Sequence, residues 1–423
     1  MPTLVSGIRT SAAAIALAAA LACGSAYAAG APGKVEIGRG EPIQIRALLS
    51  GSVVADISPV IEAAVELAIE DFGPIHGHPV SVRTLDEKCS GEGGRAAAEA
   101  VVGDANVVGV IGTLCSGAAV EASPILGAAG FSMISPANTS PRLTSDLAGK
   151  AGPDYHEGYF RVANNDLVMA GVVARFGYEE LGLRRMVAVH DGDAYTSALA
   201  NAFAVAFRRH GGVVPIVSQV AKGQTDMSAV LAELAGAKPD GVLLPLFPAE
   251  GKSLIRQAAG FDGLKGVRMI GGDAMLTRAI LALPEAEGLY LTAPDPGDAK
   301  NVNQATGRGA ADVLRAIETA LGRRPASGYW AHGYDAMTLL LSAIKQVAAP
   351  GEETLSIDRR ALRDALAGTA GFRGLLGTLA CDEFGDCGTG RSVIHFHADS
   401  SVEDPLRLPV VYKGTPGLHG PRR

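Results

Sequence analysis

Two hydroxyl side chains, Ser116 and Thr139, follow apolar runs of the kind that form buried strands. The run 107–112 leads through a short turn into a helical pattern, so Ser116 falls at or near the first helical turn, where backbone N–H groups lack partners. These groups and the positive end of the helix dipole favour a carboxylate, and the hydroxyl adds a donor. The next apolar run ends just before Ala137, Asn138 and Thr139, at the same predicted sheet edge. The pattern indicates a carboxylate-binding site; an ordinary N-cap role for Ser116 fits the spacing equally well.

Other polar groups give weaker indications of chemistry. Histidines two residues apart occur at 76 and 78 and at 395 and 397, and on a strand such a pair faces one side, where a metal could bind. Imidazoles in a surface turn and on a terminal strand are the simpler interpretation. The chain contains no nucleophile elbow, phosphate loop, dinucleotide fingerprint or C-x-x-C pair. We therefore expect a protein that is not an enzyme, with no metal and no cofactor.

Strand-like and helix-like segments alternate along the chain, which is the pattern that positions such a site. A first series runs from Ile43 to about residue 136, and a second follows an irregular stretch rich in Pro, Gly and Ser, 137–158. Alternation of this kind predicts parallel sheets covered by helices on both faces. We therefore predict an α/β protein with two doubly wound lobes. The later segments have no obvious place in that order: helices at 308–321, 330–348 and 358–368 and β-like stretches at 392–399 and 408–413.

Composition and the N-terminal segment indicate an exported protein. The net charge of −7 without basic runs argues against a nucleic-acid partner. Residues 1–28 combine Arg9, a short apolar run and a small-residue pattern before a cleavage point after Ala28, as in a secretory signal peptide. Removing them changes the net charge from −7 to −8, because Arg9 is their only charged side chain. The alternative is a lipoprotein anchored at Cys23.

The mature chain then keeps an even number of cysteines, which in an exported protein predicts disulfides. Proximity favours Cys89 with Cys115 and Cys381 with Cys387, and two other pairings remain open. The longer loop would contribute about 3 kcal/mol to stability on the chain-entropy account.

Several ordered segments resemble one known family over nearly the whole mature length. The chain is similar to the solute-binding proteins of branched-chain amino acid (Leu/Ile/Val) ABC transporters, which have the type I periplasmic binding protein fold. The matching segments are LDEKCSGEGGRAAAEAVV, GVIGTLCSG, SMISPANTSPRLT, YFRVANND, VAVHDGDAYTSALA, DMSAVLAELAGAKPDGVLLP, MIGGDAM, GYDAM and CDEFGD.

The resemblance implies roles for particular residues. Ser116, Ala137 and Thr139 would hold the ligand carboxylate, and Asp273 would receive an ammonium group. Tyr195 matches the family's aromatic residue after the His-Asp strand. Two positions depart from the family. Phe247 stands where a tyrosine is expected, and the early loop 50–58 carries no aromatic residue.

The resemblance also places the C-terminal segments. It implies two lobes joined by three hinge crossings, near 162–167, 291–296 and 387–393, with helices 308–348 returning to the first lobe. The expected division assigns 29–164 plus 295–389 to lobe 1 and 165–294 plus 390–423 to lobe 2.

The expected function is capture of a small amino acid, branched-chain or related, in a cleft between the lobes. A periplasmic protein of this kind would deliver its ligand to the membrane permease subunits of an ABC importer. Two alternatives keep the fold. One is binding of an aromatic or aliphatic carboxylate or an amide, and the other is a ligand sensor for a membrane receptor.

Overall fold

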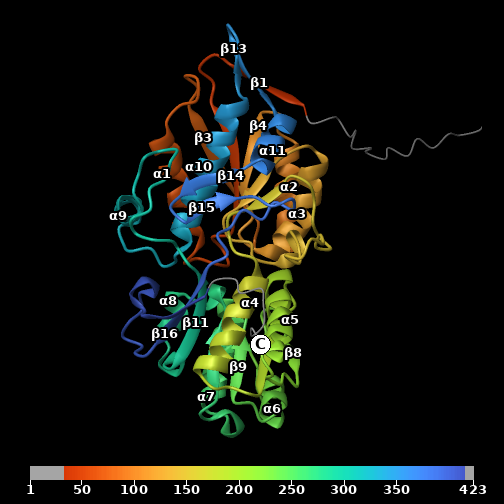
Figure 1. Cartoon of the computed structure of the whole chain (residues 1–423), viewed down its shortest axis with the longest axis vertical. Helices are drawn as coiled ribbons and strands as arrows, with labels where there is room; N and C mark the ends of the chain where they lie inside the picture. Colours follow the sequence, from red (N-terminus) through yellow and green to blue (C-terminus); the bar gives the residue numbers. More distant parts are fainter. Residues whose placement is uncertain (1–32, 415–423) are drawn as a thin grey trace, which may run out of the picture.

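The computed structural model describes residues 33–414, which form two lobes stacked along the long axis of the molecule (Figure 1). The proposed signal peptide and Cys23 lie outside the described residues. Within residues 33–414, none of the helices combines the length and the apolar character that crossing a membrane requires.

The first lobe is built on a parallel sheet of strand order β3-β2-β4-β5-β6. The residues of β4 are all buried, as expected for a central strand covered on both faces. The strand bounds are β2 Ile43–Leu49, β3 Val80–Asp86, β4 Val107–Gly112, β5 Met133–Ser135 and β6 Tyr159–Arg161.

Helices cover both faces of this sheet. The helices α1 and α10 pack together on one face, and α2 and α3 pack together on the other. The long helix α10 is buried along most of its length, because α1, α9 and α11 lie against it. The helix bounds are α1 Ser58–Phe72, α2 Gly91–Val102, α3 Ser116–Ala128, α9 Ala310–Leu321, α10 Tyr329–Val347 and α11 Arg359–Ala367.

The second lobe is built on a sheet of order β17-β16-β11-β10-β9-β7-β8. Strands β8, β7, β9, β10 and β11 are parallel, whereas β16 and β17 add antiparallel to the β11 edge. This edge differs from the wholly parallel sheet expected from the sequence, because the two strands come from the C-terminal segment. The bounds are β7 Met186–His190, β8 Val217–Gln219, β9 Gly241–Leu244, β10 Arg268–Gly271, β11 Leu289–Pro294, β16 Ser392–His397 and β17 Val410–Gly414.

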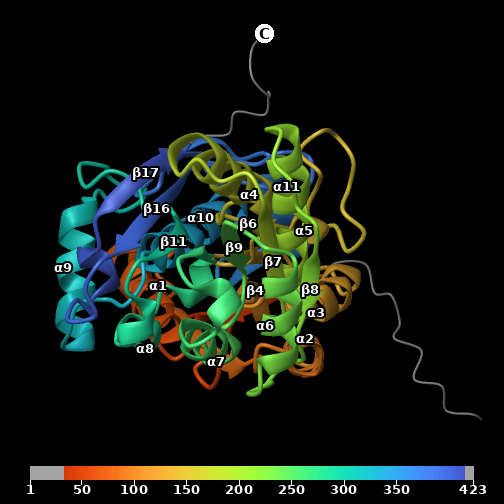
Figure 2. The same cartoon turned by 90° about the horizontal axis from the view of Figure 1, so that it is seen from below.

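Helices again lie on both faces of the second sheet. Seen from below, α4 and α5 cover one face and α7 and α8 the other (Figure 2). Helix α6 packs with α7 and with the core cluster of that second face. The bounds are α4 Asp166–Arg175, continued by a π-helical turn Phe176–Glu180, α5 Ala194–Arg209, α6 Ser228–Gly236, α7 Pro248–Ala259 and α8 Arg278–Leu281.

Two small antiparallel sheets that the sequence analysis did not predict complete the first lobe. One has the order β1-β13-β12, and the other pairs β14 with β15. The carboxylate of Asp335 in α10 accepts hydrogen bonds from the N–H groups of Leu375 and Leu376 and so fixes the turn between β14 and β15. The bounds are β1 Lys34–Gly38, β12 Ala349–Pro350, β13 Thr354–Asp358, β14 Ala370–Gly374 and β15 Gly377–Ala380.

Within residues 33–414 the chain passes between the two main sheets three times, after β6, after β11 and between β15 and β16. These passages overlap the three hinge crossings expected from the sequence, so the fold class is confirmed. The C-terminal helices lie with the first lobe, and β16 and β17 lie with the second.

Candidate functional site

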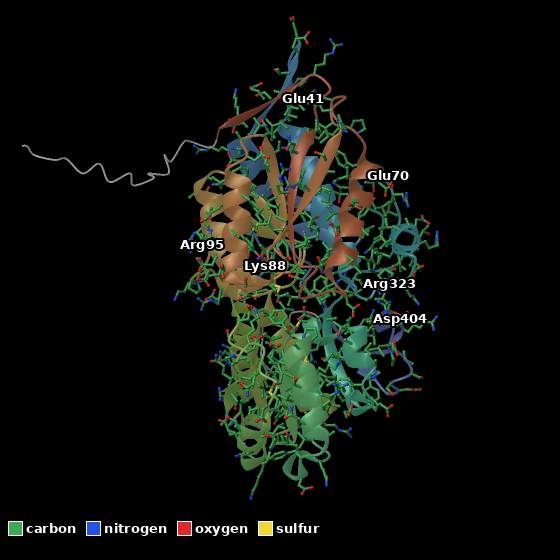
Figure 3. All side chains as sticks on the ribbon, turned by 180° about the vertical axis from the view of Figure 1, so that it is seen from behind. Glu41, Glu70, Lys88, Arg95, Arg323 and Asp404 are labelled. Carbon is green, nitrogen blue, oxygen red and sulfur yellow. A yellow bond between two sulfur atoms is a disulfide. The ribbon has the colours of Figure 1, made fainter. Side chains whose placement is uncertain are left out.

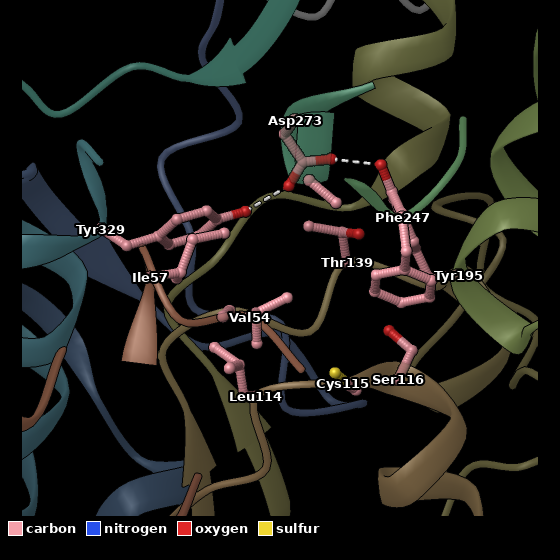
Figure 4. Close-up of a pocket in the computed structure, with 12 residues that line it drawn as sticks. Val54, Ile57, Leu114, Cys115, Ser116, Thr139, Tyr195, Phe247, Asp273 and Tyr329 are labelled. Carbon is pink, nitrogen blue, oxygen red and sulfur yellow. Dashed lines mark hydrogen bonds between the residues drawn. The ribbon is translucent and has the colours of Figure 1, made fainter. Parts of the chain in front are cut away.

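A cavity lies between the lobes at the carboxyl ends of the strands, with about 380 Å³ of empty space. Its lining, drawn in Figure 4, comes from both lobes: Val54, Ile57, Leu114, Cys115, Ser116, Ala137, Thr139, Tyr195, Phe247, Asp273, Ala274 and Tyr329.

The start of α3 forms the first wall of the cavity. Ser116 is the first residue of the helix, and the N-cap is Cys115, which makes no side-chain cap bond. The Ser116 hydroxyl instead accepts a hydrogen bond from the N–H of Ser140 at 3.4 Å. The N-cap role considered for Ser116 is therefore wrong. Its hydroxyl and the unpaired N–H groups of the first helical turn lie where an anion would be favoured.

The segment after β5 supplies Ala137 and Thr139 to the same wall, whereas Asn138 between them lies outside the lining. The Asn138 side chain is fully buried, and its Oδ1 accepts hydrogen bonds from Thr113 Oγ1 at 3.1 Å and Tyr159 OH at 3.2 Å. Asn138 therefore fixes the strand end from inside the lobe.

Asp273 faces these hydroxyls from the second lobe, in a short 3-10 turn after β10. Its Oδ1 accepts a hydrogen bond from Tyr195 OH at 2.6 Å, and its Oδ2 accepts one from Tyr329 OH at 2.5 Å (Figure 4). Tyr195 stands at the start of α5 in the second lobe, and Tyr329 is the first residue of α10 in the first lobe. The Tyr329 bond therefore joins the lobes across the cavity.

Burial sets the electrostatics of this side of the cavity. Desolvation raises the pKa of Asp273, and the two tyrosine hydroxyls partly oppose that rise. Asp166, the buried first residue of α4, has a pKa raised well above its usual range by desolvation and by the nearby Asp273. Among the described residues, those lining the cavity include no lysine or arginine. The second-lobe side is therefore suited to a cation, and the first-lobe side to an anion.

Apolar side chains form the rest of the lining. Val54 lies in the loop before α1, and Ile57 is the N-cap residue of that helix. Leu114 comes directly before the N-cap residue of α3. Phe247, the N-cap residue of α7, packs edge-on against Tyr195 with ring centres 5.8 Å apart. The early loop thus contributes aliphatic side chains, and an aliphatic group of a ligand would be desolvated there.

Six of the lining residues were predicted from the sequence: Ser116, Ala137, Thr139, Tyr195, Phe247 and Asp273. The other lining residues were not predicted: Val54, Ile57, Leu114, Cys115, Ala274 and Tyr329. A signal for Tyr329 existed. The pair Tyr329 and Trp330, with the only tryptophan of the chain, opens the long helical pattern that becomes α10.

Both predicted disulfides are present. Cys89–Cys115 joins the residue before the N-cap of α2 to the N-cap of α3, with Cα atoms 5.1 Å apart, and Cys381–Cys387 closes a short loop in the third crossing. Beside the first disulfide, the buried Glu87 accepts a hydrogen bond from the N–H of Cys115 at 3.3 Å. Desolvation raises the pKa of Glu87 to about 8.

Comparisons with known proteins agree with this architecture. Residues 47–386 match the profile of the family described as periplasmic binding protein. The Leu/Ile/Val-binding protein homolog 3 of Brucella melitensis is 28% identical over 353 residues, which is 81% of this chain and 88% of the relative.

Two solved structures share the fold. The leucine binding protein LivK from Thermotoga maritima has a TM-score of 0.76 at 23% identity, covering 88% of this chain and 99% of the other. A solute binding protein of an ABC transporter from R. palustris, in complex with benzoate, has a TM-score of 0.72 at 18% identity, covering 89% and 97%.

Proposed function

The chain belongs to the periplasmic binding protein family, and from that premise we propose that it captures a small amino acid, branched-chain or related, between its lobes. It would then deliver this ligand to the membrane permease subunits of an ABC importer. A binding role, rather than a catalytic one, fits a cavity whose polar groups are matched to the two ends of a zwitterion. The leucine and Leu/Ile/Val-binding relatives support this class of ligand.

One observation carries the proposal: hydrogen-bond donors that suit an anion line one side of the cavity, and a carboxylate that suits a cation lines the other. Ser116, Thr139 and the start of α3 offer hydrogen-bond donors to a carboxylate. Asp273 faces them from the other lobe and would pair with an ammonium group, which cannot be buried without such a partner. The aliphatic lining near Val54 and Ile57 would take the side chain.

A second ligand class is favoured by one specific contact. Both oxygens of Asp273 already accept hydrogen bonds from tyrosine hydroxyls, which leaves fewer free positions for an ammonium group. Phe247 also offers no hydroxyl. An aromatic or aliphatic carboxylate without an amino group, or an amide, would then occupy the same cavity.

A thermal-shift panel separates the two classes. Leucine, valine, phenylalanine and benzoate are tested against the mature protein, because a ligand at 100 times its dissociation constant stabilises the folded state by about 2.7 kcal/mol. Stabilisation by leucine or valine and not by benzoate supports the amino-acid class. Stabilisation by benzoate alone rejects it, and mass spectrometry of the natively purified protein then identifies what the cavity holds.

We further propose that the two lobes close on the ligand as rigid bodies, with lobe 1 comprising 29–164 plus 295–389 and lobe 2 comprising 165–294 plus 390–423. Ligand contacts made to both lobes supply the differential affinity that shifts the population toward the closed form. X-ray scattering with and without ligand should show compaction, and identical profiles would argue against closure.

The proposed location is the periplasm, reached through cleavage of a signal peptide after Ala28. Anchoring through a lipid on Cys23 is the alternative. Intact mass of the protein recovered from the exporting cell distinguishes an N-terminus at Ala29 from a lipidated Cys23.

A further inference from the structure

The lobes also meet beside the cavity, at the starts of α3 and α5. Asp193 is the N-cap of α5, and its Oδ1 accepts a hydrogen bond from the N–H of Tyr195 at 2.9 Å. Its other oxygen lies against Gly117, the second residue of α3 in the opposite lobe. A Cβ built on Gly117 would overlap Asp193 Oδ2, so with any larger residue the Asp193 side chain would have to shift before the lobes could meet this closely. The carboxylate is thereby placed at the N-terminal end of α3, where the helix dipole favours negative charge.

Lys222, in the loop after β8 of the second lobe, reaches across the same junction. Its Nζ donates a hydrogen bond to the backbone oxygen of Cys89 in the first lobe at 2.8 Å and lies 3.4 Å from Asp193 Oδ2. The same ammonium lies 4.9 Å from the centre of the Phe247 ring, which lines the cavity. Lys222 therefore lies beside a residue of the cavity lining and contacts both lobes.

The Lys222 loop is anchored on its own lobe, so the lysine is held in position. The N–H of Gly223 donates to Glu250 Oε1 at 2.5 Å, and the N–H of Ala221 donates to Gln224 Oε1 at 2.9 Å. The side chain of Asp193 is only 5% exposed. Lys222 belongs to the same lobe as Asp193 and compensates its buried charge in either state, whereas the α3 N-terminus adds its stabilisation only while the lobes are together.

We propose that Gly117, Asp193 and Lys222 form an interlobe clasp that holds the closed form and slows ligand release. The inference rests on the proposed function for the identity of the ligand, but the clasp itself contacts no ligand-lining hydroxyl. These are positioning residues: they act on the equilibrium between open and closed lobes. A ligand bound between the lobes leaves only after the clasp opens, so its dissociation rate follows the strength of the clasp.

The first test measures leucine and benzoate release by stopped flow, using the fluorescence of Trp330, which adjoins the cavity residue Tyr329. Lys222→Met should raise the dissociation rate about tenfold while changing the association rate much less. The matched control is Lys265→Met, because Lys265 is exposed and pairs with Asp262 inside the second lobe. An unchanged dissociation rate in Lys222→Met overturns the clasp.

The salt dependence of the dissociation rate distinguishes this role of Lys222 from a purely structural one. Screening weakens the attraction of the partly exposed Lys222 ammonium for the Cys89 carbonyl of the other lobe, which Lys222→Met lacks, so 0.5 M NaCl should speed release from the wild type more than from Lys222→Met. An equal salt response in both proteins contradicts the proposal.

Gly117→Ala tests the contact from the first lobe. Alanine raises helix propensity at this position, so it should not unfold α3, yet its Cβ meets Asp193 only when the lobes close. We expect faster ligand release with unchanged or higher thermal stability of the ligand-free protein. Release at the wild-type rate counts against the clasp.

A ligand-free measurement separates failure of the clasp from failure of the proposed function. Hydrogen exchange of the peptide containing the first turn of α3 should be faster in Lys222→Met than in the wild type and in Lys265→Met, because the closed form shields it. Equal exchange overturns the clasp even if no tested compound binds. Faster exchange without any leucine or benzoate binding supports the clasp and leaves only the ligand class wrong.

Discussion

Arg161 and Asp386, 225 residues apart in the chain, form a buried bidentate ion pair where the first and third crossings meet. Arg161 Nε lies 3.1 Å from Asp386 Oδ1 and Nη2 lies 2.7 Å from Oδ2, with the arginine fully buried. Arg161 Nη1 also donates to the backbone oxygen of Ser140 at 2.8 Å, directly after Thr139. The pair therefore fixes both the hinge and the segment that lines the cavity.

Removing one partner of the buried Arg161–Asp386 pair should lower the free energy of unfolding far more than breaking an ion pair on the surface. Asp386→Asn leaves the guanidinium buried without its counter-charge, so we expect a destabilisation of about 3–5 kcal/mol in urea unfolding. The control is Glu179→Gln, which breaks the exposed pair with Arg175 and should cost less than about 1 kcal/mol. Similar costs for the two variants would contradict the structural role of the buried pair.

Asp273→Asn tests the proposed ammonium site. If an amino acid binds there, removing the charge should weaken binding by about 2–5 kcal/mol in calorimetry with leucine. Asp262→Asn, at an exposed position of the same lobe, is the control and should bind as the wild type does. Unchanged leucine affinity in Asp273→Asn would remove this residue from the proposed site.

Tyr329→Phe tests the bond that joins the lobes through Asp273. It removes one hydrogen bond to a charged group, worth about 1.5–3 kcal/mol, so leucine or benzoate affinity should fall at least about tenfold. Tyr412→Phe removes a hydroxyl on the edge strand β17, away from the cavity lining, and should have no effect on binding. Equal affinities in the two variants would mean that the Tyr329 bond does not contribute to closure.

The pH dependence of binding should identify the ligand class, because burial raises the pKa of Asp273. An ammonium group requires the ionised carboxylate, so amino-acid affinity should fall as the pH falls through this raised pKa. A carboxylate without an amino group is repelled by ionised Asp273, so its affinity should rise as the pH falls, with proton uptake. Calorimetry in buffers of different ionisation enthalpy gives the sign, and pH-independent binding of both ligands would contradict the role of Asp273.

Glu87 should make the protein less stable at higher pH. Its pKa is about 8 in the folded state, above the ordinary value of 4.5, so the folded state binds more protons between these values and stability falls as the pH rises through them. Glu87→Gln should be more stable than the wild type by on the order of 3 kcal/mol near pH 8 and nearly equal at pH 5.

Urea unfolding at the two pH values measures the Glu87 effect. Glu353→Gln, an exposed substitution, is the control and should follow the wild type at both. A stability difference between Glu87→Gln and the wild type that does not change with pH would show that the carboxyl does not titrate in this range.

The strands and helices could be predicted because each depends on the spacing of apolar residues within its own segment of the chain. Buried runs such as 107–112 predict strands, and the serine and threonine that follow them are placed by the rule that parallel strands end at one edge. Tyr329 could not be placed this way, because it reaches Asp273 from another lobe and across 56 residues of sequence.

Other features depend on direction or on long-range pairing. Side chains at a strand end alternate, and the sequence alone did not show that Asn138 turns into the lobe while Ala137 and Thr139 face the cavity. The short strands β12 and β14 were missed because their pairing, not their composition, defines them. Closeness of Gly117 to Asp193 likewise follows only from how the lobes meet.

The pairing of β16 with β11, which brings His397 opposite Leu289, has a consequence for biogenesis. In Figure 3, Lys88 lies at the lower end of the upper lobe and Asp404, from the segment between β16 and β17, at the upper end of the lower lobe. Because β16 is made after β11 and after the first-lobe elements α9 to β15, the β11 edge of the lower sheet has no partner strand until β16 is made. A chain threaded through a translocon during synthesis would therefore keep this edge unpaired until β16 has emerged, and a product terminated before β16 would be exposed to proteases.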